Sequence, residues 1–206
     1  IFLSMRIGAA ELTPIAFVGS FVEIKEVGCD SGESVDKKTG EPMEIICMDT
    51  VYSVRYQVEK VLEGNLMASA EVKFQAADHY GFPAFAEQRR ALIYLQQYED
   101  GYWHIKYQWN EAYATNDGDF AQCGCGARDY YDSDDDDPVL VKDCRSISFS
   151  PPVTRDLTHA SKYVVDKLRA SLDYQVRGDR AYCVRGVLVE DLYRQERPGL
   201  IEVLNE

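Results

Sequence analysis

The chain has 206 residues, 46% of them hydrophobic, with a formal net charge of −13 and a sequence pI near 4.7. This apolar content is enough for a packed core, so an intrinsically disordered chain is excluded. The negative balance argues against nucleic acid and anionic lipid surfaces, because both attract basic proteins. The longest apolar runs, such as residues 91–95, fall well short of the roughly 20 residues of a membrane helix, and we expect no transmembrane segment.

The first part of the chain predicts three strands. Residues 15–25 form an apolar, β-rich run in which Gly19 indicates a bulge or a sharp bend. Residues 52–59 alternate between apolar and polar side chains, which is the period of a strand with one buried face. Residues 71–75 follow a Glu-Gly-Asn turn and form the third predicted strand.

Two more strands are predicted next along the chain. Residues 83–90 predict a short helix, and residues 91–97 predict a well-buried strand. Asp100-Gly101 is a hairpin signal, and residues 102–109 alternate again as a fifth strand. Five strands separated by turns indicate a small barrel or a sandwich.

An acidic run follows at residues 129–138, which have the sequence Asp-Tyr-Tyr-Asp-Ser-Asp-Asp-Asp-Asp-Pro. Residues 117–143 hold nine acids and two bases, so this stretch carries −7 of the net charge of −13. Three aspartates alternate like the first ligands of a calcium loop, but the later glycine and glutamate of such a loop are missing. We therefore predict a solvated acidic linker at residues 129–150, with weak binding of a divalent cation as the alternative.

The last part of the chain predicts mixed secondary structure. Apolar residues between positions 157 and 172 recur at helical spacing. Residues 181–189 and 200–203 are predicted as two strands joined by a charged loop. Because residues 151–206 are too few for a comfortable core of their own, we expect them to pack on the preceding strands.

The six cysteines are even in number and lie in loop-like surroundings, which favours disulfides in an oxidising compartment. We predict that Cys29 pairs with Cys47 and that Cys144 pairs with Cys183. Cys123 and Cys125 are then left to pair with each other under strain, to pair elsewhere or to remain free. A metal site is the alternative, but a closed zinc site needs about four ligands, and the three histidines are widely separated in sequence.

Three segments carry a family resemblance: residues 17–24 (Phe-Val-Gly-Ser-Phe-Val-Glu-Ile), residues 52–64 (Tyr-Ser-Val-Arg-Tyr-Gln-Val-Glu-Lys-Val-Leu-Glu-Gly) and residues 91–95 (Ala-Leu-Ile-Tyr-Leu). They resemble the netrin-like, TIMP-like OB-fold modules of secreted proteins, and residues 102–120 look similar to the closing strands of bacterial members. The resemblance covers residues 12–125 and implies a five-stranded barrel used as a binding scaffold, without a shared catalytic site. Metalloprotease inhibitors of that family chelate zinc through an initial cysteine, whereas this chain begins with Ile1, so that mechanism is not carried over.

The sequence and the resemblance together predict a mainly β fold with an α+β extension. Its parts are an OB-like five-stranded barrel at residues 1–128, the acidic linker at residues 129–150, and a helix with a β-hairpin at residues 151–206. The hairpin and the helix are expected to pack on the barrel.

The sequence contains no nucleophile elbow, no Cys-x-x-Cys pair, no His-Glu-x-x-His helix and no phosphate-binding glycine loop. We therefore predict a protein that is not an enzyme and has no cofactor. Alternation places Trp103, Tyr107 and Trp109 on one face of the fifth strand, and exposed aromatic side chains there would bind a partner protein. A basic partner surface would be attracted by the acidic residues Asp134, Asp135, Asp136 and Asp137.

The predicted function is that of an acidic extracytoplasmic binding protein, of the inhibitor or toxin-immunity type, which occludes a partner protein. It would be periplasmic or secreted, with lipid attachment before processing left open. One alternative is a redox or hydrolytic enzyme that uses Cys123 and Cys125. The other is a surface structural or adhesion module.

Overall fold

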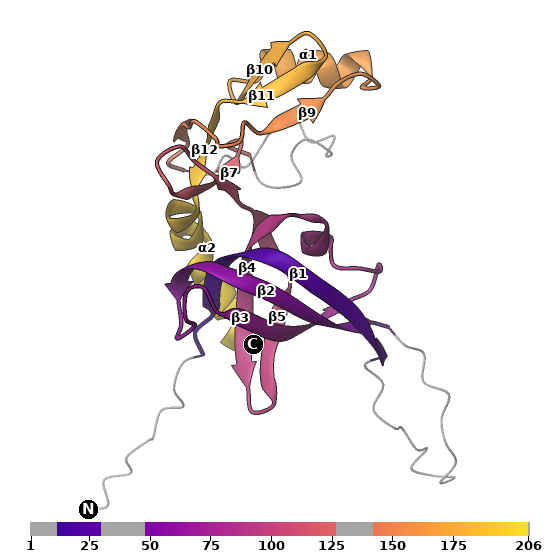
Figure 1. Ribbon diagram of the computed structural model, residues 1–206, viewed down its shortest axis with the longest axis vertical. Helices are drawn as coiled ribbons and strands as arrows, with labels where there is room; N and C mark the ends of the chain where they lie inside the picture. The colour runs from indigo at the N-terminus through magenta and orange to yellow at the C-terminus, as the bar shows by residue number, and fades with distance from the viewer. Residues whose placement is uncertain (1–11, 30–47, 127–141, 206) are drawn as a thin grey trace, which may run out of the picture.

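A closed five-stranded barrel forms the first part of the molecule. The computed structural model describes residues 12–29, 48–126 and 142–205. The barrel strands follow the order β1-β2-β3-β5-β4, in which β3 and β5 are parallel and all other neighbours are antiparallel (Figure 1). Its elements are β1 (Ile15–Cys29), β2 (Thr50–Glu63), β3 (Glu71–Asp78), the short 3-10 helix η1 (Ala84–Glu87), β4 (Arg90–Tyr98) and β5 (Gly101–Glu111). The predicted mainly β class and the five predicted strands are confirmed.

The alternating pattern of β2 fills the barrel interior. Val54, Tyr56 and Val58 are buried in the barrel core, while the residues between them are only half-buried. The Tyr56 hydroxyl donates a hydrogen bond to the carbonyl oxygen of Phe85 on η1, 2.8 Å away. Burial raises the pKa of Tyr56 well above its ordinary value. The 3-10 helix thus packs on the barrel core through both an apolar and a polar contact.

Gly19 has the role that the sequence indicates. The register between β1 and β2 shifts between Val18 and Gly19. A Cβ atom at position 19 would lie 2.8 Å from the Gln57 carbonyl oxygen and 2.8 Å from the Phe17 ring. Only glycine fits where β1 bends to pair with β2 on one side and β4 on the other.

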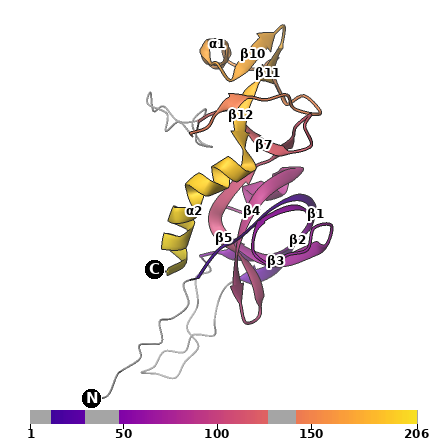
Figure 2. The same ribbon diagram turned by 90° about the vertical axis from the view of Figure 1, so that its left-hand side faces the viewer.

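The outer wall of the barrel carries a second apolar core under helix α2 (Val189–Asn205). Five consecutive residues of β4, at positions 91–95, are buried, because one side of the strand faces the barrel interior and the other faces the helix. Figure 2 shows α2 running along the barrel beside β4 and β5. The helix contributes its apolar residues to this core: Val189, Leu192, Tyr193, Leu200 and Leu204.

Polar contacts fix the position of α2 on the barrel. The Arg197 guanidinium donates to both carboxylate oxygens of Glu63, at 2.6 and 2.8 Å. That hydrogen bond lowers the pKa of Glu63, although partial burial acts in the opposite direction. Glu196 accepts from the Tyr94 hydroxyl at 2.5 Å and from the Asn110 amide at 2.8 Å. Since these bonds are made at specific atoms, they set the helix register as well as its attachment.

The extension beyond the barrel consists of two small sheets and a helix, at the upper end of Figure 1. One sheet has the strand order β6-β7-β12-β8 and the other has the order β10-β11-β9. Ser161 caps the extension's helix by accepting a hydrogen bond from the backbone N–H of Val164. In chain order the elements are β6 (Tyr113–Ala114), β7 (Phe120–Cys123), β8 (Arg145–Ser146), β9 (Thr154–Asp156), α1 (Lys162–Ala170), β10 (Tyr174–Arg177), β11 (Arg180–Cys183) and β12 (Arg185–Leu188).

Two of the strand predictions for the extension are wrong. Residues 200–203 belong to α2, which continues through Pro198. Residues 181–189 do not form one strand, because β11 ends at Cys183, β12 begins at Arg185, and Val189 starts α2. The hairpin of the extension is β10 with β11, around Gly178 at φ +60°. Packing of α2 on the barrel outweighs the loss of the proline hydrogen bond, which no local pattern reveals.

We predict that Leu192→Ala lowers the free energy of unfolding by about 2 to 5 kcal/mol, because this side chain is only 2% exposed under the barrel wall. Val203→Ala, at a 52% exposed position of the same helix, is the matched control and should change it by less than about 0.5 kcal/mol. Urea unfolding of both variants gives the comparison. Equal effects would mean that α2 does not pack on β4 as described.

Candidate functional site

The short segment Cys123-Gly124-Cys125, at the end of β7, forms two disulfides with other parts of the extension. Cys123 is bonded to Cys183 at the end of β11, with the Cα atoms 6.1 Å apart. Cys125 is bonded to Cys144, which lies just before β8, with the Cα atoms 5.5 Å apart. Gly124 has φ +85°, and its N–H donates to the Arg185 carbonyl oxygen at 3.0 Å. The turn at this glycine lets neighbouring cysteines form bonds to two different parts of the extension.

The predicted pairing of Cys144 with Cys183 is therefore wrong. Each of these cysteines bonds to the Cys-Gly-Cys segment instead. The prediction kept the C-terminal cysteines together, whereas β7 pairs with β12 and lies within the extension. Of the three outcomes left open for Cys123 and Cys125, pairing elsewhere is the one observed. The predicted partner of Cys29, Cys47, lies outside the described residues.

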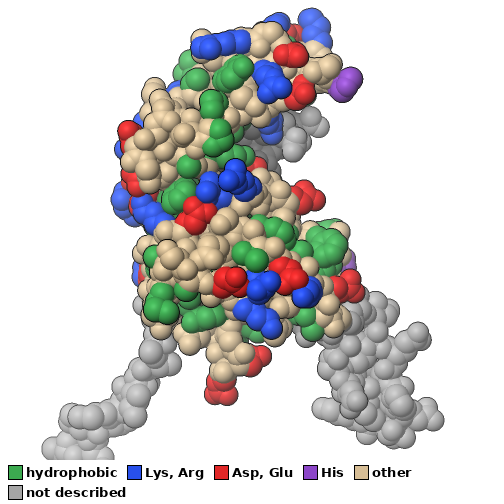
Figure 3. Space-filling model, viewed as in Figure 1, with side chains coloured by type: hydrophobic (Ala, Val, Ile, Leu, Met, Phe, Trp, Pro, Cys, Tyr) green, Lys and Arg blue, Asp and Glu red, His purple; other side chains and the backbone are tan. Residues whose placement is uncertain are grey.

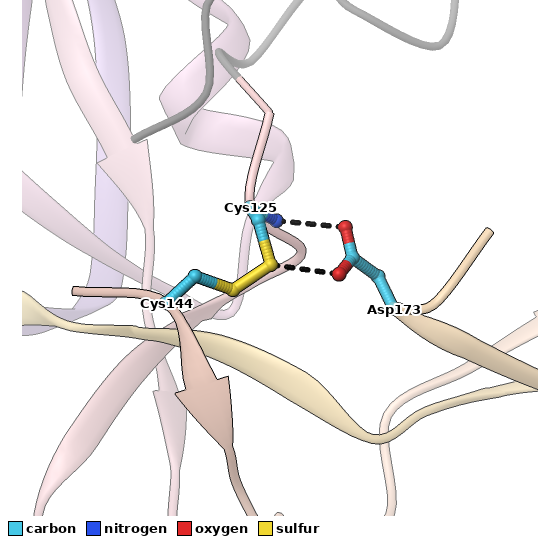
Figure 4. Close-up of side chains that lie close together, drawn as sticks. All are labelled: Cys125, Cys144 and Asp173. Atoms are coloured by element: carbon cyan, nitrogen blue, oxygen red, sulfur yellow. Dashed lines mark hydrogen bonds between the residues drawn. A yellow bond between two sulfur atoms is a disulfide. The ribbon is translucent and has the colours of Figure 1, made fainter. Parts of the chain in front are cut away.

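A buried carboxylate lies directly against one of these disulfides (Figure 4). Asp173, in the turn before β10, accepts a hydrogen bond at Oδ2 from the Cys125 backbone N–H at 2.9 Å. Its Oδ1 atom lies 2.7 Å from Cys125 Sγ and 3.6 Å from Arg185 Nη1. Both Asp173 and Cys125 are less than 10% exposed. Nothing in the sequence around position 173 indicates this contact, so Asp173 was not predicted as a site residue.

The same three residues are the candidate metal ligands of the described part of the chain. One atom each from Cys125, Cys144 and Asp173 lies within 4.8 Å of the other two. Zinc binds cysteine as the thiolate, and the two sulfurs are joined in a disulfide. In this form the arrangement suits sulfur redox chemistry, and it does not suit metal ligation.

The other disulfide has a different environment. Cys123 and Cys183 lie in an apolar cluster with Ala121 and Phe149, and the Tyr174 hydroxyl lies 3.2 Å from Cys123 Sγ. A hydroxyl is a neutral donor that satisfies a sulfur lone pair. This pair is therefore packed like a structural link, and the polar contacts of its sulfurs in the described part of the chain are the Tyr174 hydroxyl and the Arg185 carbonyl oxygen.

A second feature is a group of exposed apolar side chains at one end of the barrel, which we call the aromatic end. It consists of Met48, Tyr80, Phe82 and Tyr107, which are 65%, 87%, 60% and 42% exposed. The Tyr80 and Tyr107 rings are 6.4 Å apart, and the Phe82 ring lies 5.0 Å from Tyr52 on β2. His79 connects the group, because its ring packs against Tyr80 and its Nδ1 hydrogen-bonds the Met48 carbonyl oxygen.

The alternation that places three aromatic residues on one face of β5 is interrupted. The pairing of β4 with β5 shifts between Ile93 and Leu95, and Tyr107 has φ +63° in this bulge. Trp103 and Trp109 are half-buried, and Trp109 packs against the barrel core beside Phe85. Among the predicted aromatic residues, Tyr107 is thus the exposed one. Tyr80 and Phe82 were not predicted as contact residues, although two aromatic residues on either side of Gly81 indicate exposed rings in a turn.

Charged side chains beside the aromatic end are arranged in pairs. Lys106 donates to both carboxylate oxygens of Asp49 at 2.7 Å, and its ammonium lies 5.0 Å from the centre of the Tyr107 ring. Burial lowers the pKa of Lys106, but the hydrogen bonds with Asp49 and Tyr107 outweigh it and hold the pKa above its ordinary value. On the barrel face seen in Figure 3, acidic and basic side chains are likewise interspersed. Arg55 on β2 forms ion pairs with Glu23 and Glu71.

The predicted acidic residues Asp134, Asp135, Asp136 and Asp137 lie outside the described residues. Their electrostatic role and the alternative of divalent-cation binding therefore stay predictions. Neither helix in the described ranges is long and apolar enough to cross a membrane.

Comparison with family models, curated proteins and solved structures returned no match to this chain. The netrin-like relationship thus stays a prediction from the sequence.

We predict that removing the Cys123–Cys183 bond destabilises the protein more than removing the Cys125–Cys144 bond. The first joins residues 60 positions apart and the second joins residues 19 apart, which corresponds to about 4 and about 3 kcal/mol of chain entropy. Urea unfolding of the double variants C123S/C183S and C125S/C144S measures the difference. The reverse order would show that loop length does not control the contribution of these bonds.

Proposed function

We propose that this protein is a non-enzymatic binding module of an oxidising extracytoplasmic compartment, and that its aromatic end contacts a partner protein. The observation that supports the proposal is the exposure of four large side chains, Met48, Tyr80, Phe82 and Tyr107, at one place on a folded barrel. Contiguous apolar side chains on a soluble domain mark interaction surfaces, because water contact with them is unfavourable. Tyrosine and other aromatic residues also supply much of the binding energy in protein interfaces.

The backbone at Tyr107 supports the same surface. A bulky residue with φ near +63° is uncommon, and here it coincides with the bulge of β5. Such backbone positions cluster at functional sites. The bulge turns the Tyr107 ring toward Tyr80, away from the register that would continue the barrel face.

Charge favours a basic partner. The net charge of −13 attracts a basic protein over a distance and raises its association rate. Lys106 adds little opposing charge at the surface, because Asp49 neutralises it. In this proposal the module acts as inhibitors and immunity proteins do, by covering a functional surface of its partner. The two disulfides fit an oxidising compartment such as the periplasm or the extracellular space.

The double variant Tyr80→Ser/Phe82→Ser tests the proposal. Tyr163→Ser is the matched control, because Tyr163 is 65% exposed on α1, in the extension. Pull-down from the native extracytoplasmic fraction should recover the same partner with the wild type and the control. The double variant should lose at least about 2 kcal/mol of binding energy, roughly 30-fold in affinity.

Repeating the pull-down at low and high salt tests the electrostatic part, since added salt screens attraction between exposed charges. We expect recovery to fall at about 0.5 M salt, where the Debye length is only a few ångströms. A partner that the double variant retains as well as the wild type would rule out the aromatic end as the contact surface.

A further inference from the structure

The two disulfides differ in how a thiol can reach them. Cys183 lies on β11, the central strand of its sheet, where it pairs with Tyr174 on β10. Cys144 precedes β8, a two-residue edge strand that pairs with β12. Cys123 and Cys144 are both half-buried, and their partners Cys183 and Cys125 are 7% and 4% exposed. The difference lies in the backbone, because Cys123 and Cys183 belong to paired strands, whereas Cys125 and Cys144 lie outside strands. A small thiol can therefore exchange with the Cys125–Cys144 bond without opening a sheet.

The Asp173 carboxylate distinguishes the two forms of the Cys125–Cys144 pair. A disulfide sulfur has no proton to donate, so the 2.7 Å contact between Cys125 Sγ and Asp173 Oδ1 carries no hydrogen bond in the oxidised form. A thiol at Cys125 would donate its S–H to that oxygen. A hydrogen bond to an ionised acceptor is stronger than one between neutral groups, so the contact stabilises the reduced form relative to the disulfide.

The Asp173 carboxylate also makes the two sulfurs different, because it lies against Cys125 and not against Cys144. Its Oδ1 atom lies closer to Cys125 Sγ, at 2.7 Å, than to the Arg185 guanidinium, at 3.6 Å, so the negative charge disfavours a thiolate at Cys125. Cys144 Sγ lies on the side of the bond away from the carboxylate (Figure 4), and Cys144 is the half-buried member of the pair. A thiolate is better solvated at such a position than at the buried Cys125. In the dithiol form Cys125 is then the thiol, and Cys144 is the sulfur that becomes the nucleophile.

We propose that Cys125 and Cys144 form a thiol–disulfide exchange site for a dithiol reductant, with Cys144 as the attacked sulfur and Asp173 as the acceptor for the Cys125 thiol. The proposal does not depend on partner binding at the aromatic end. The redox enzyme considered from the sequence would use Cys123 and Cys125. The exchange site proposed from the structure instead uses Cys125 and Cys144, which are 19 positions apart.

The exchange proceeds in two steps. A thiolate of the reductant attacks Cys144 Sγ, a mixed disulfide forms, and the bond between Cys144 and Cys125 breaks. The electron pair goes to Cys125 Sγ, which takes a proton from water and donates it in a hydrogen bond to Asp173 Oδ1. The second thiol of the reductant then attacks the reductant's other sulfur, which is bonded to Cys144 in the mixed disulfide. This step releases Cys144 as a thiol. Two electrons and two protons pass from the dithiol to the cysteines, and the reductant becomes a disulfide.

Exchange at this pair opens a loop and leaves the rest of the junction closed. The Cys125–Cys144 bond closes the sequence segment that contains Asp134 to Asp137. The Cys123–Cys183 bond still joins β7 to β11 when the first bond is reduced. The covalent state of this one disulfide therefore determines whether the acidic segment is part of a closed loop.

Brief reduction of the native full-length protein with dithiothreitol, followed by alkylation and peptide mapping, tests the proposal. We expect alkylated Cys125 and Cys144 to accumulate at least about tenfold faster than alkylated Cys123 and Cys183. Opening of both bonds at the same rate, or of Cys123–Cys183 first, would overturn it. Limiting iodoacetamide on the partly reduced protein should label Cys144 before Cys125, and equal labelling would equally overturn the assigned roles.

The variant Asp173→Asn tests the carboxylate. In a dithiothreitol redox buffer we expect it to shift the equilibrium of the Cys125–Cys144 pair about tenfold toward the disulfide, as loss of a hydrogen bond to a charged group implies. The preference for labelling Cys144 should also decrease. Asp166→Asn on α1, an exposed position, is the matched control and should change neither value. If Asp173→Asn has the same redox equilibrium and the same labelling order as the wild type, Asp173 has no role in the exchange. If that variant does not fold, the labelling order in the wild type decides.

Discussion

The pairing of β7 with β12 is the interaction on which the arrangement of the molecule depends. β7 follows the barrel in the chain, and β12 leads directly into α2, so their pairing determines where the helix begins against the barrel wall. The strands approach closely at Gly186, where any Cβ atom would collide with the Gln122 carbonyl oxygen. The disulfides from Cys123 and Cys125 hold the end of this pairing. Strands of two to four residues bury little apolar area, and covalent links compensate for a small core.

The helix that follows this junction makes the barrel and the extension parts of one structure. β4 is buried on both faces because α2 covers the side that a free barrel would expose to water. Lys60 on β2 pairs with Asp119 just before β7 and with Glu190 at the start of α2. Barrel, junction and helix thus meet at one lysine. The strands β6 and β7 lie within the predicted barrel unit in sequence, yet they pair with the extension.

Local patterns predicted the parts of the fold that local interactions control. The alternation of residues 52–59 and the Asp100-Gly101 turn identified β2 and the β4–β5 hairpin, because strand period and turn chemistry act over a few residues. The same reasoning failed for α2, where Pro198-Gly199 reads as a loop and the deciding contacts lie on β1, β4 and β5. It also failed for the pairing of Cys144 with Cys183 and for Asp173, since the observed contacts join residues far apart in sequence. The exposed position of Tyr107 depends on a bulge that alternation alone hides.

The two candidate sites lie in different parts of the molecule and are built differently. The aromatic end gathers exposed rings from the turn after β3 and from the bulge of β5, whereas the site around Cys125 lies within the extension and is mostly buried. Turns are free to change without disturbing the barrel strands, which suits a contact surface. The carboxylate beside a disulfide instead needs the β7–β12 junction to hold both groups in place.

Tryptic digestion of the unreduced protein, with mass spectrometry of the linked peptides, tests the central claim about the junction most directly. Cys123 and Cys125 share the tryptic peptide 107–128, while Cys144 lies in peptide 143–145 and Cys183 in peptide 181–185. The structure predicts one product in which peptide 107–128 is bonded to both of the others. A product that joins peptide 143–145 directly to peptide 181–185 would contradict it.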